Sequence, residues 1–144
     1  MKNANELLEE LAHIRGEYEK QLKRFCEFVA EIQEVISIDA RLAGIDLDVI
    51  ENNLLKIRFI DKELHVKYSY FLDKNNNQKG RITCYDICST PDINYKVINS
   101  FCFDGLGTTD ISINDERGPY VISTRPDAVN ILLYWLRTSL DEDS

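Results

Sequence analysis

The sequence predicts an α+β fold: a long N-terminal amphipathic helix, an antiparallel β-meander of five or six strands, and a C-terminal helix packed on the sheet. Two changes of hydrophobic period support this prediction. Apolar residues recur every three or four positions over 1–36, alternate with polar residues through much of 54–123, and return to helical spacing over 124–140. The 144 residues fit a single domain, 1–144, that is large enough to enclose a core.

The N-terminal helix is expected to be longer than the sheet that it covers. Its apolar residues follow helical steps with one stutter: Ala4, Leu7, Leu11, Ile14, Tyr18, Leu22, Phe25, Val29, Ile32 and Ile36. At about 1.5 Å per residue the helix would be roughly 50 Å long, whereas strands of five to eight residues reach about 17–27 Å. Either the helix breaks near Gly16, or its first part packs on something else. We expect a homodimer with contacts at Leu7, Leu11, Ile14 and Tyr18.

Residues 37–53 have no clear period, and we interpret them as an acidic connector with a short helix over 39–43 as one option. The period of two then begins. The clearest strand alternates Leu64, Val66 and Tyr68 with His65 and Lys67. The expected strands cover 54–60, 63–72, 81–88, 95–103, 108–113 and 119–123.

The C-terminal helix is predicted from its start signals. Thr124 is followed three residues later by Asp127, and Pro126 lies in the first turn, a combination typical of a capped helix N-terminus. The helix should run over 124–140, and 141–144 should form a frayed tail.

The formal charge of −8 is concentrated at the two ends of the chain. Residues 1–53 carry −6, residues 54–124 are balanced, and residues 125–144 carry −2. An acidic surface repels phosphates, so we expect no direct binding of nucleic acid and no membrane contact. Glu27, Glu31 and Glu34 form an acidic row near the end of the first helix, where carboxylates oppose the helix dipole. This row is a candidate site for a protein partner with a basic surface, although a solvated charged face is the simpler interpretation.

The segment "FCFDGLGTTDISI" (101–113) could be a phosphate-binding loop or a tight turn. A phosphate loop usually opens a helix and carries a basic residue. Here the glycines are followed by alternating residues typical of a strand, and Asp104 and Asp110 would repel a phosphate. We therefore interpret the segment as a hairpin turn.

No metal or cofactor is expected. Cys84 and Cys88 would lie about 13 Å apart on a strand, too far to chelate one ion, and the cysteines are interpreted as reduced structural thiols. His65 lies on the polar strand face with Glu63 and Lys67, which suits either a general base or an ordinary solvated face. No recognisable catalytic motif accompanies it, so no catalytic residue is assigned.

Function is predicted only as a class. The N-terminus lacks the apolar core of a signal peptide, which favours a cytoplasmic protein. The leading hypothesis is an acidic, non-catalytic binding protein that neutralises or escorts another protein, as immunity proteins, defence inhibitors and chaperones do. The first alternative is a homo-oligomer that holds a small ligand, such as a nucleotide, in a pocket formed by Tyr68, Tyr70 and Arg125. The second alternative is an enzyme that uses His65.

Overall fold

The computed structural model describes residues 3–75, 77–88, 92–113 and 115–141. Its first element is a single unbroken helix, α1 (Ala4–Ile38), 35 residues long. Asn3 caps this helix, because its side-chain Oδ1 accepts a hydrogen bond from the backbone N–H of Glu6 over 2.9 Å. The predicted long helix is therefore confirmed, and it passes through Gly16 without a break.

Five strands form one antiparallel meander in the spatial order β1-β2-β3-β4-β5. Their bounds are Ile45–Glu51, Leu54–Phe59, Lys62–Leu72, Gln78–Cys88 and Asn94–Phe103. Neighbours along the chain are also neighbours in the sheet, so every connection is a short hairpin. The predicted α+β class and antiparallel sheet are confirmed.

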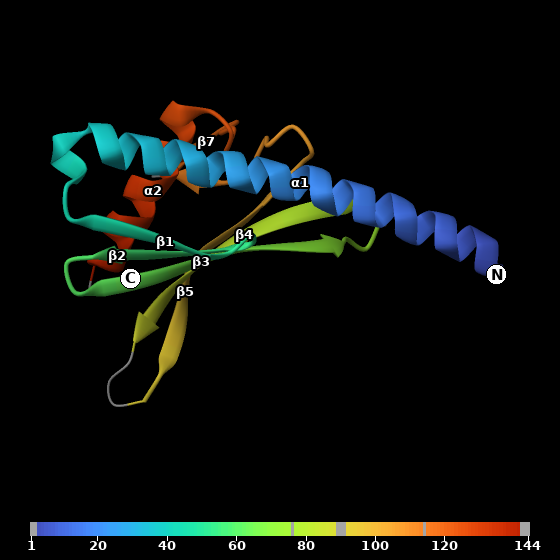
Figure 1. Ribbon diagram of the computed structural model, residues 1–144, viewed down its shortest axis with the longest axis horizontal. Coiled ribbons are helices and arrows are strands. Elements are labelled where there is room, and N and C mark those ends of the chain that lie inside the picture. Colours follow the sequence, from blue (N-terminus) through green and yellow to red (C-terminus); the bar gives the residue numbers. More distant parts are fainter. Residues whose placement is uncertain (1–2, 76, 89–91, 114, 142–144) are drawn as a thin grey trace.

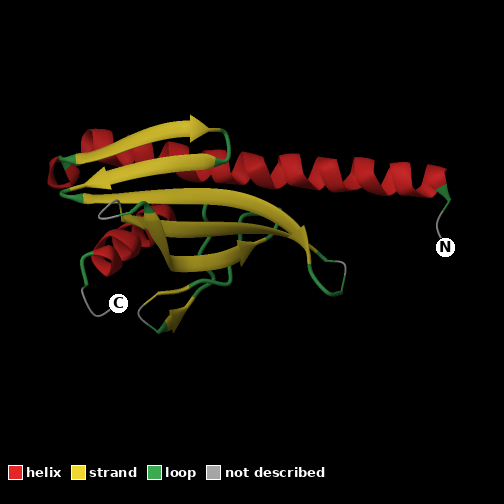
Figure 2. Cartoon of the chain, turned by 90° about the horizontal axis from the view of Figure 1, so that it is seen from below, coloured by secondary structure: helices red, strands yellow, loops and turns green. Residues whose placement is uncertain are grey.

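Both helices pack on the same face of this sheet (Figures 1 and 2). α2 (Arg125–Ser139) lies beside α1, and the two together cover the apolar side of the strands. The core contains the fully buried Trp135 of α2, which is stacked with Phe101 at a centroid distance of 6.4 Å and meets Phe28 edge-on at 5.7 Å. No helix of the described residues lies on the opposite face of the sheet.

Residues 37–53 differ from the prediction. The short 3-10 helix η1 (Ala40–Leu42) falls within the optional helix, but the supposed connector then forms the edge strand β1. Its apolar residues Ile45 and Leu47 face the core, while Asp46 and Asp48 lie opposite Arg58 and Lys56 of β2. These cross-strand charge pairs compensate for the low strand propensity of aspartate.

The prediction of strands over 108–113 and 119–123 is wrong in extent. In the described part of this stretch the strands are β6 (Ser112–Ile113) and β7 (Glu116–Arg117), which form a separate two-stranded sheet. Thr108 and Thr109 make isolated bridges to Val121 and Phe103. This stretch folds as a packed loop because its apolar side chains, such as the fully buried Ile122, enter the core beside the sheet instead of extending it.

The start of α2 also differs in detail. Thr124 precedes the helix as predicted, but its hydroxyl caps no backbone N–H. It donates instead to the carbonyl of Val121 and to Asp127, which also accepts from the N–H of Val121. The helix ends at Ser139, and the predicted tail lies outside the described residues beyond Asp141. No helix in the described ranges is long and apolar enough to cross a membrane.

Candidate partner-binding surface

The N-terminal part of α1 extends past the end of the sheet (Figure 1). Over the described helix, no residue before Gln21 is buried. The last aromatic contact between this part of the helix and the body is made by Tyr18, whose ring lies 5.4 Å from that of Tyr68 and 6.0 Å from that of Tyr70. The predicted overhang is therefore present, and we name residues 4–17 the α1 overhang.

The α1 overhang exposes large apolar side chains. Leu7, Leu8 and Leu11 are 47%, 65% and 61% exposed, although Leu7 and Leu11 continue the stripe that is buried further along the same helix. Ile14 is half-buried. Of the four residues predicted to contact a second chain, Leu7 and Leu11 are free for that role, whereas Tyr18 already packs on tyrosines of its own chain.

An acidic row runs along the α1 overhang beside Leu7 and Leu11, whereas Leu8 lies on the opposite side of the helix. Glu6, Glu10 and Glu17 follow each other at intervals of four and seven residues, which places them along one side of the helix. Residues 4–17 contain four glutamates and one arginine, a formal charge of −3. The sequence predicts the partner-binding row further along the same helix, at Glu27, Glu31 and Glu34. It does not single out the glutamates of the overhang, because the exposure of the leucines beside them depends on the tertiary structure.

The predicted row Glu27, Glu31 and Glu34 is occupied by arginines of the same chain. Arg24 contacts Glu27 at 3.0 Å, and Arg125 at the start of α2 contacts Glu31 at 2.8 Å and Glu34 at 2.6 Å. Glu31 and Glu34 thereby link α1 to α2, whereas Glu27 is paired within α1. The three carboxylates are therefore poorly placed to attract a basic partner.

The predicted ligand pocket is not assembled. Tyr68 is fully buried, and its hydroxyl donates to the backbone carbonyl of Tyr18 over 3.0 Å. Burial raises the pKa of the Tyr68 hydroxyl, and the neighbouring tyrosines raise it further. The Tyr70 hydroxyl donates to Gln78 over 2.6 Å. Arg125 contacts Glu31, which is 13 residues beyond Tyr18 and therefore about 20 Å further along α1.

The glycine-containing segment is a turn, as predicted. The Asp104 carboxylate accepts hydrogen bonds from the backbone N–H groups of Leu106 and Thr108 over 2.9 and 3.0 Å. Gly107 has a φ of 85°, a value that favours glycine. The loop thus directs its amides to its own aspartate, which leaves them unsuited to hold a phosphate.

His65 lies on the face of the sheet that no helix covers. Its Nε2 is 3.1 Å from Glu63, which also contacts Lys56 at 3.4 Å. Partial burial alone would raise the pKa of the Glu63 carboxyl, but hydrogen bonds and charges from Lys56 and His65 outweigh it, so the pKa lies below its usual value. Beside this cluster is an open hollow of about 290 Å³. It is lined by Leu54, His65, Lys67, Tyr85, Ile87 and Tyr95.

The cysteines form no disulfide within the described chain. Cys84 is buried, and burial, with a smaller contribution from Asp86, raises the pKa of its thiol, which keeps it protonated and unreactive. Cys26 and Cys88 are exposed on different elements. Among the described residues, no group of three or more His, Cys, Asp or Glu side chains is arranged to hold a metal ion.

No family model matches this chain, and no curated protein or solved structure is significantly similar to it.

Proposed function

We propose that this protein is a non-catalytic binding module that neutralises or escorts another protein, and that it holds this partner at the α1 overhang. The observation that carries the proposal is the coincidence of the exposed Leu7 and Leu11 with an acidic row on a helix that projects from the body. Exposed apolar patches rimmed by polar residues are typical of protein interaction sites.

The chemistry of the overhang favours a basic amphipathic segment as its occupant. Apolar side chains of the partner would cover the leucines, and its lysines or arginines would face Glu6, Glu10 and Glu17. A second copy of this chain would cover the same leucines but would bring another charge of −3 against the first. The homodimer predicted at Leu7 and Leu11 is therefore less favourable at this surface than a complex with a basic segment.

Affinity capture from extracts of the source cells tests the proposal with matched variants. The double variant Leu7→Ser/Leu11→Ser should lose the captured partner, and Glu6→Gln/Glu10→Gln/Glu17→Gln should weaken capture at low salt. Leu106→Ser is the control, because Leu106 lies in a loop outside the α1 overhang and its exposure of 68% resembles the 61% of Leu11. The proposal fails if no protein is captured at low salt, or if the leucine and control variants capture it equally well.

A further inference from the structure

One edge of the sheet is open over most of a strand. β5 pairs with β4 on one side, but on its other side only its last two residues have a partner in the described chain. Cys102 exchanges hydrogen bonds with Asp110, and Phe103 bridges Thr109. Between Asn94 and Ser100 no backbone hydrogen bond from another described segment reaches this side. Seven residues of strand amount to a free edge of about 24 Å.

The side chains along this edge do little to prevent pairing. Natural sheets protect their edges with charges, prolines or bulges. From Asn94 to Ser100 the chain contains no proline and one charge, Lys96. A register shift opposite Cys84 and Tyr85 interrupts the strand near Ile98, but Asn94–Val97 remains a regular run.

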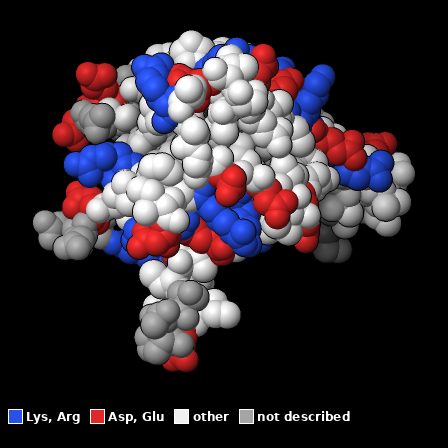
Figure 3. Space-filling view, turned by 60° about the vertical axis from the view of Figure 1, so that its left-hand side comes forward, with Lys and Arg blue, Asp and Glu red and all other residues white. Residues whose placement is uncertain are grey.

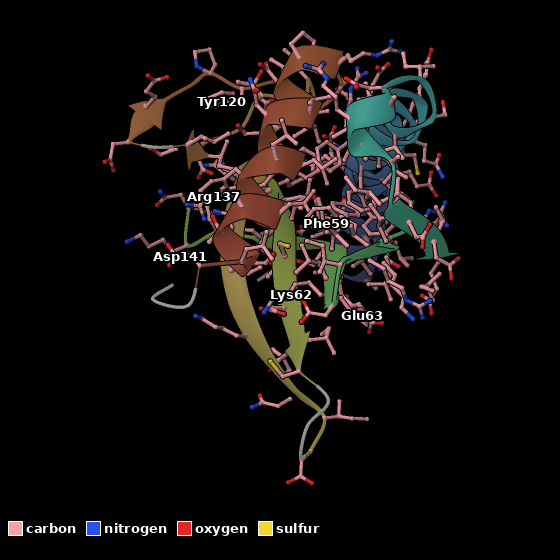
Figure 4. The ribbon with its side chains drawn as sticks, turned by 90° about the vertical axis from the view of Figure 1, so that its left-hand side faces the viewer. Phe59, Lys62, Glu63, Tyr120, Arg137 and Asp141 are labelled. Atoms are coloured by element: carbon pink, nitrogen blue, oxygen red, sulfur yellow. The ribbon has the colours of Figure 1, made fainter. Side chains whose placement is uncertain are left out.

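This part of β5 also exposes apolar surface. Tyr95 and Val97 are 65% and 48% exposed, and the Tyr95 ring meets Tyr85 of β4 edge-on at 5.3 Å. The hairpin formed by β4 and β5 projects below the rest of the molecule in Figures 3 and 4 and extends well past the end of α2. The edge is therefore open to a partner without displacement of a covering helix.

We propose that β5 pairs in antiparallel orientation with β5 of a second copy of this chain, so that the two sheets become one continuous sheet. A two-fold axis at Tyr95 places Lys96 opposite the uncharged Asn94 of the second copy, so the two lysines do not oppose each other. The rows of Tyr95 and Val97 then become continuous across the interface.

Charge favours a second copy here more than at the α1 overhang. Residues 54–124 have no formal net charge, so two copies can approach at the sheet without the repulsion that two overhangs of −3 would experience. The pairing also closes on itself. It uses the β5 edge of both copies, so the remaining edge strand of the sheet in each copy is β1. There Asp46, Asp48 and Glu51 disfavour pairing with another β1, so the assembly stops at two copies.

Light scattering after size-exclusion chromatography, over a series of protein concentrations, tests this dimer. The wild-type mass should rise to twice the chain mass of 16.7 kDa, and Val97→Lys should halve it again. Val49→Lys is the matched control, because Val49 lies on the opposite edge strand and is 47% exposed against 48% for Val97. The control should remain dimeric, as should Leu11→Ser, because the α1 overhang takes no part in this interface.

A wild-type mass of 16.7 kDa at every concentration would overturn the proposal. So would a Val97→Lys variant that stays dimeric, or a Leu11→Ser variant that becomes monomeric, since the second result would move the interface to the overhang. Amide hydrogen exchange of the wild type gives a second measurement that needs no variant. The amides of residues 94–100 that point away from β4 should lose protection on dilution, and equal protection at all concentrations would count against the pairing.

Discussion

Arg125, the first residue of α2, donates a hydrogen bond over 2.8 Å to Glu31, which lies 94 residues earlier on α1. The same guanidinium reaches Glu34 at 2.6 Å, so one side chain spans two successive turns of the long helix. Arg125 thus links α2 to Glu31 and Glu34 of α1, and we name this set of contacts the Arg125 tether. The arginine comes from the opposite end of the chain.

Removing this tether should have a small effect that depends on salt. Arg125 is 39% exposed and Glu34 is 58% exposed, so solvent screens both ion pairs. We expect Arg125→Ala to lower the melting temperature at low salt by at most about 4 °C, and by less at high salt. Circular dichroism melts at two salt concentrations measure both effects.

Arg137→Ala is the control for this prediction, since it removes the same charge from the exposed last turn of the same helix. Equal shifts in the two variants would show that net charge, and not the contact with Glu31, is responsible. Partner capture adds a test of the site assignment. If Glu31 and Glu34 were the binding row, freeing them in Arg125→Ala should strengthen capture, whereas binding at the α1 overhang should be unaffected.

The tether illustrates what the sequence could and could not predict. The period of α1 is local, so its apolar spacing predicted one long helix, and a comparison of helix and strand lengths predicted its overhang. The pairing of Arg125 with Glu31 depends on how α2 docks, and no local pattern encodes that. A row of glutamates was therefore interpreted as free when it is paired.

The missed strand β1 has a similar cause. Ile45, Leu47 and Val49 alternate with aspartates, but the acid content of the segment made it resemble a connector. The residues that make the aspartates acceptable in a strand, Lys56 and Arg58, belong to β2. The free edge of β5 was not predictable either, because it depends on the chain leaving the sheet after Phe103, where a sixth strand was expected to continue it.

The stability of η1 should depend on pH through Asp39. The Asp39 carboxylate accepts from the side chain and from the backbone N–H of Arg41, and these hydrogen bonds lower its pKa from 3.8 to about 2. Because the folded pKa is depressed, the contribution of this carboxylate is fully present above about pH 4 and is lost as the pH falls toward 2. An NMR titration of the Asp39 carboxyl carbon measures the pKa directly.

Arg41→Ala should return this pKa toward 3.8, and Arg41→Lys should do so only in part, because lysine keeps the charge but cannot form two parallel hydrogen bonds. A wild-type Asp39 that titrates near 3.8 would contradict the contact.

Gly80 of β4 should not tolerate even a methyl group. A Cβ at this position would lie 2.6 Å from the Oε1 of Gln21 and 2.7 Å from the ring of Phe103, and Gln21 and Phe103 are both buried. We expect Gly80→Ala to lower the free energy of unfolding by about 1–3 kcal/mol, because the core between α1 and the sheet must shift to admit the methyl group. Urea denaturation measures this loss, and a variant as stable as the wild type would show that α1 does not pack on β4 at Gly80.

At Gly16 the same substitution to alanine should raise the free energy of unfolding instead of lowering it. A Cβ there would meet nothing within 4 Å, and Gly16 is exposed in the interior of α1. Alanine favours a helix over glycine by about 1 kcal/mol, so Gly16→Ala should raise stability by up to about that amount. Gly16 lies just before Tyr18, where α1 reaches the body, so slower amide exchange should also spread into residues 7–14. An unchanged exchange rate there, with an unchanged unfolding midpoint, would mean that the helix is not continuous through Gly16 in solution, and the α1 overhang would then lack the rigidity that presents its leucines to a partner.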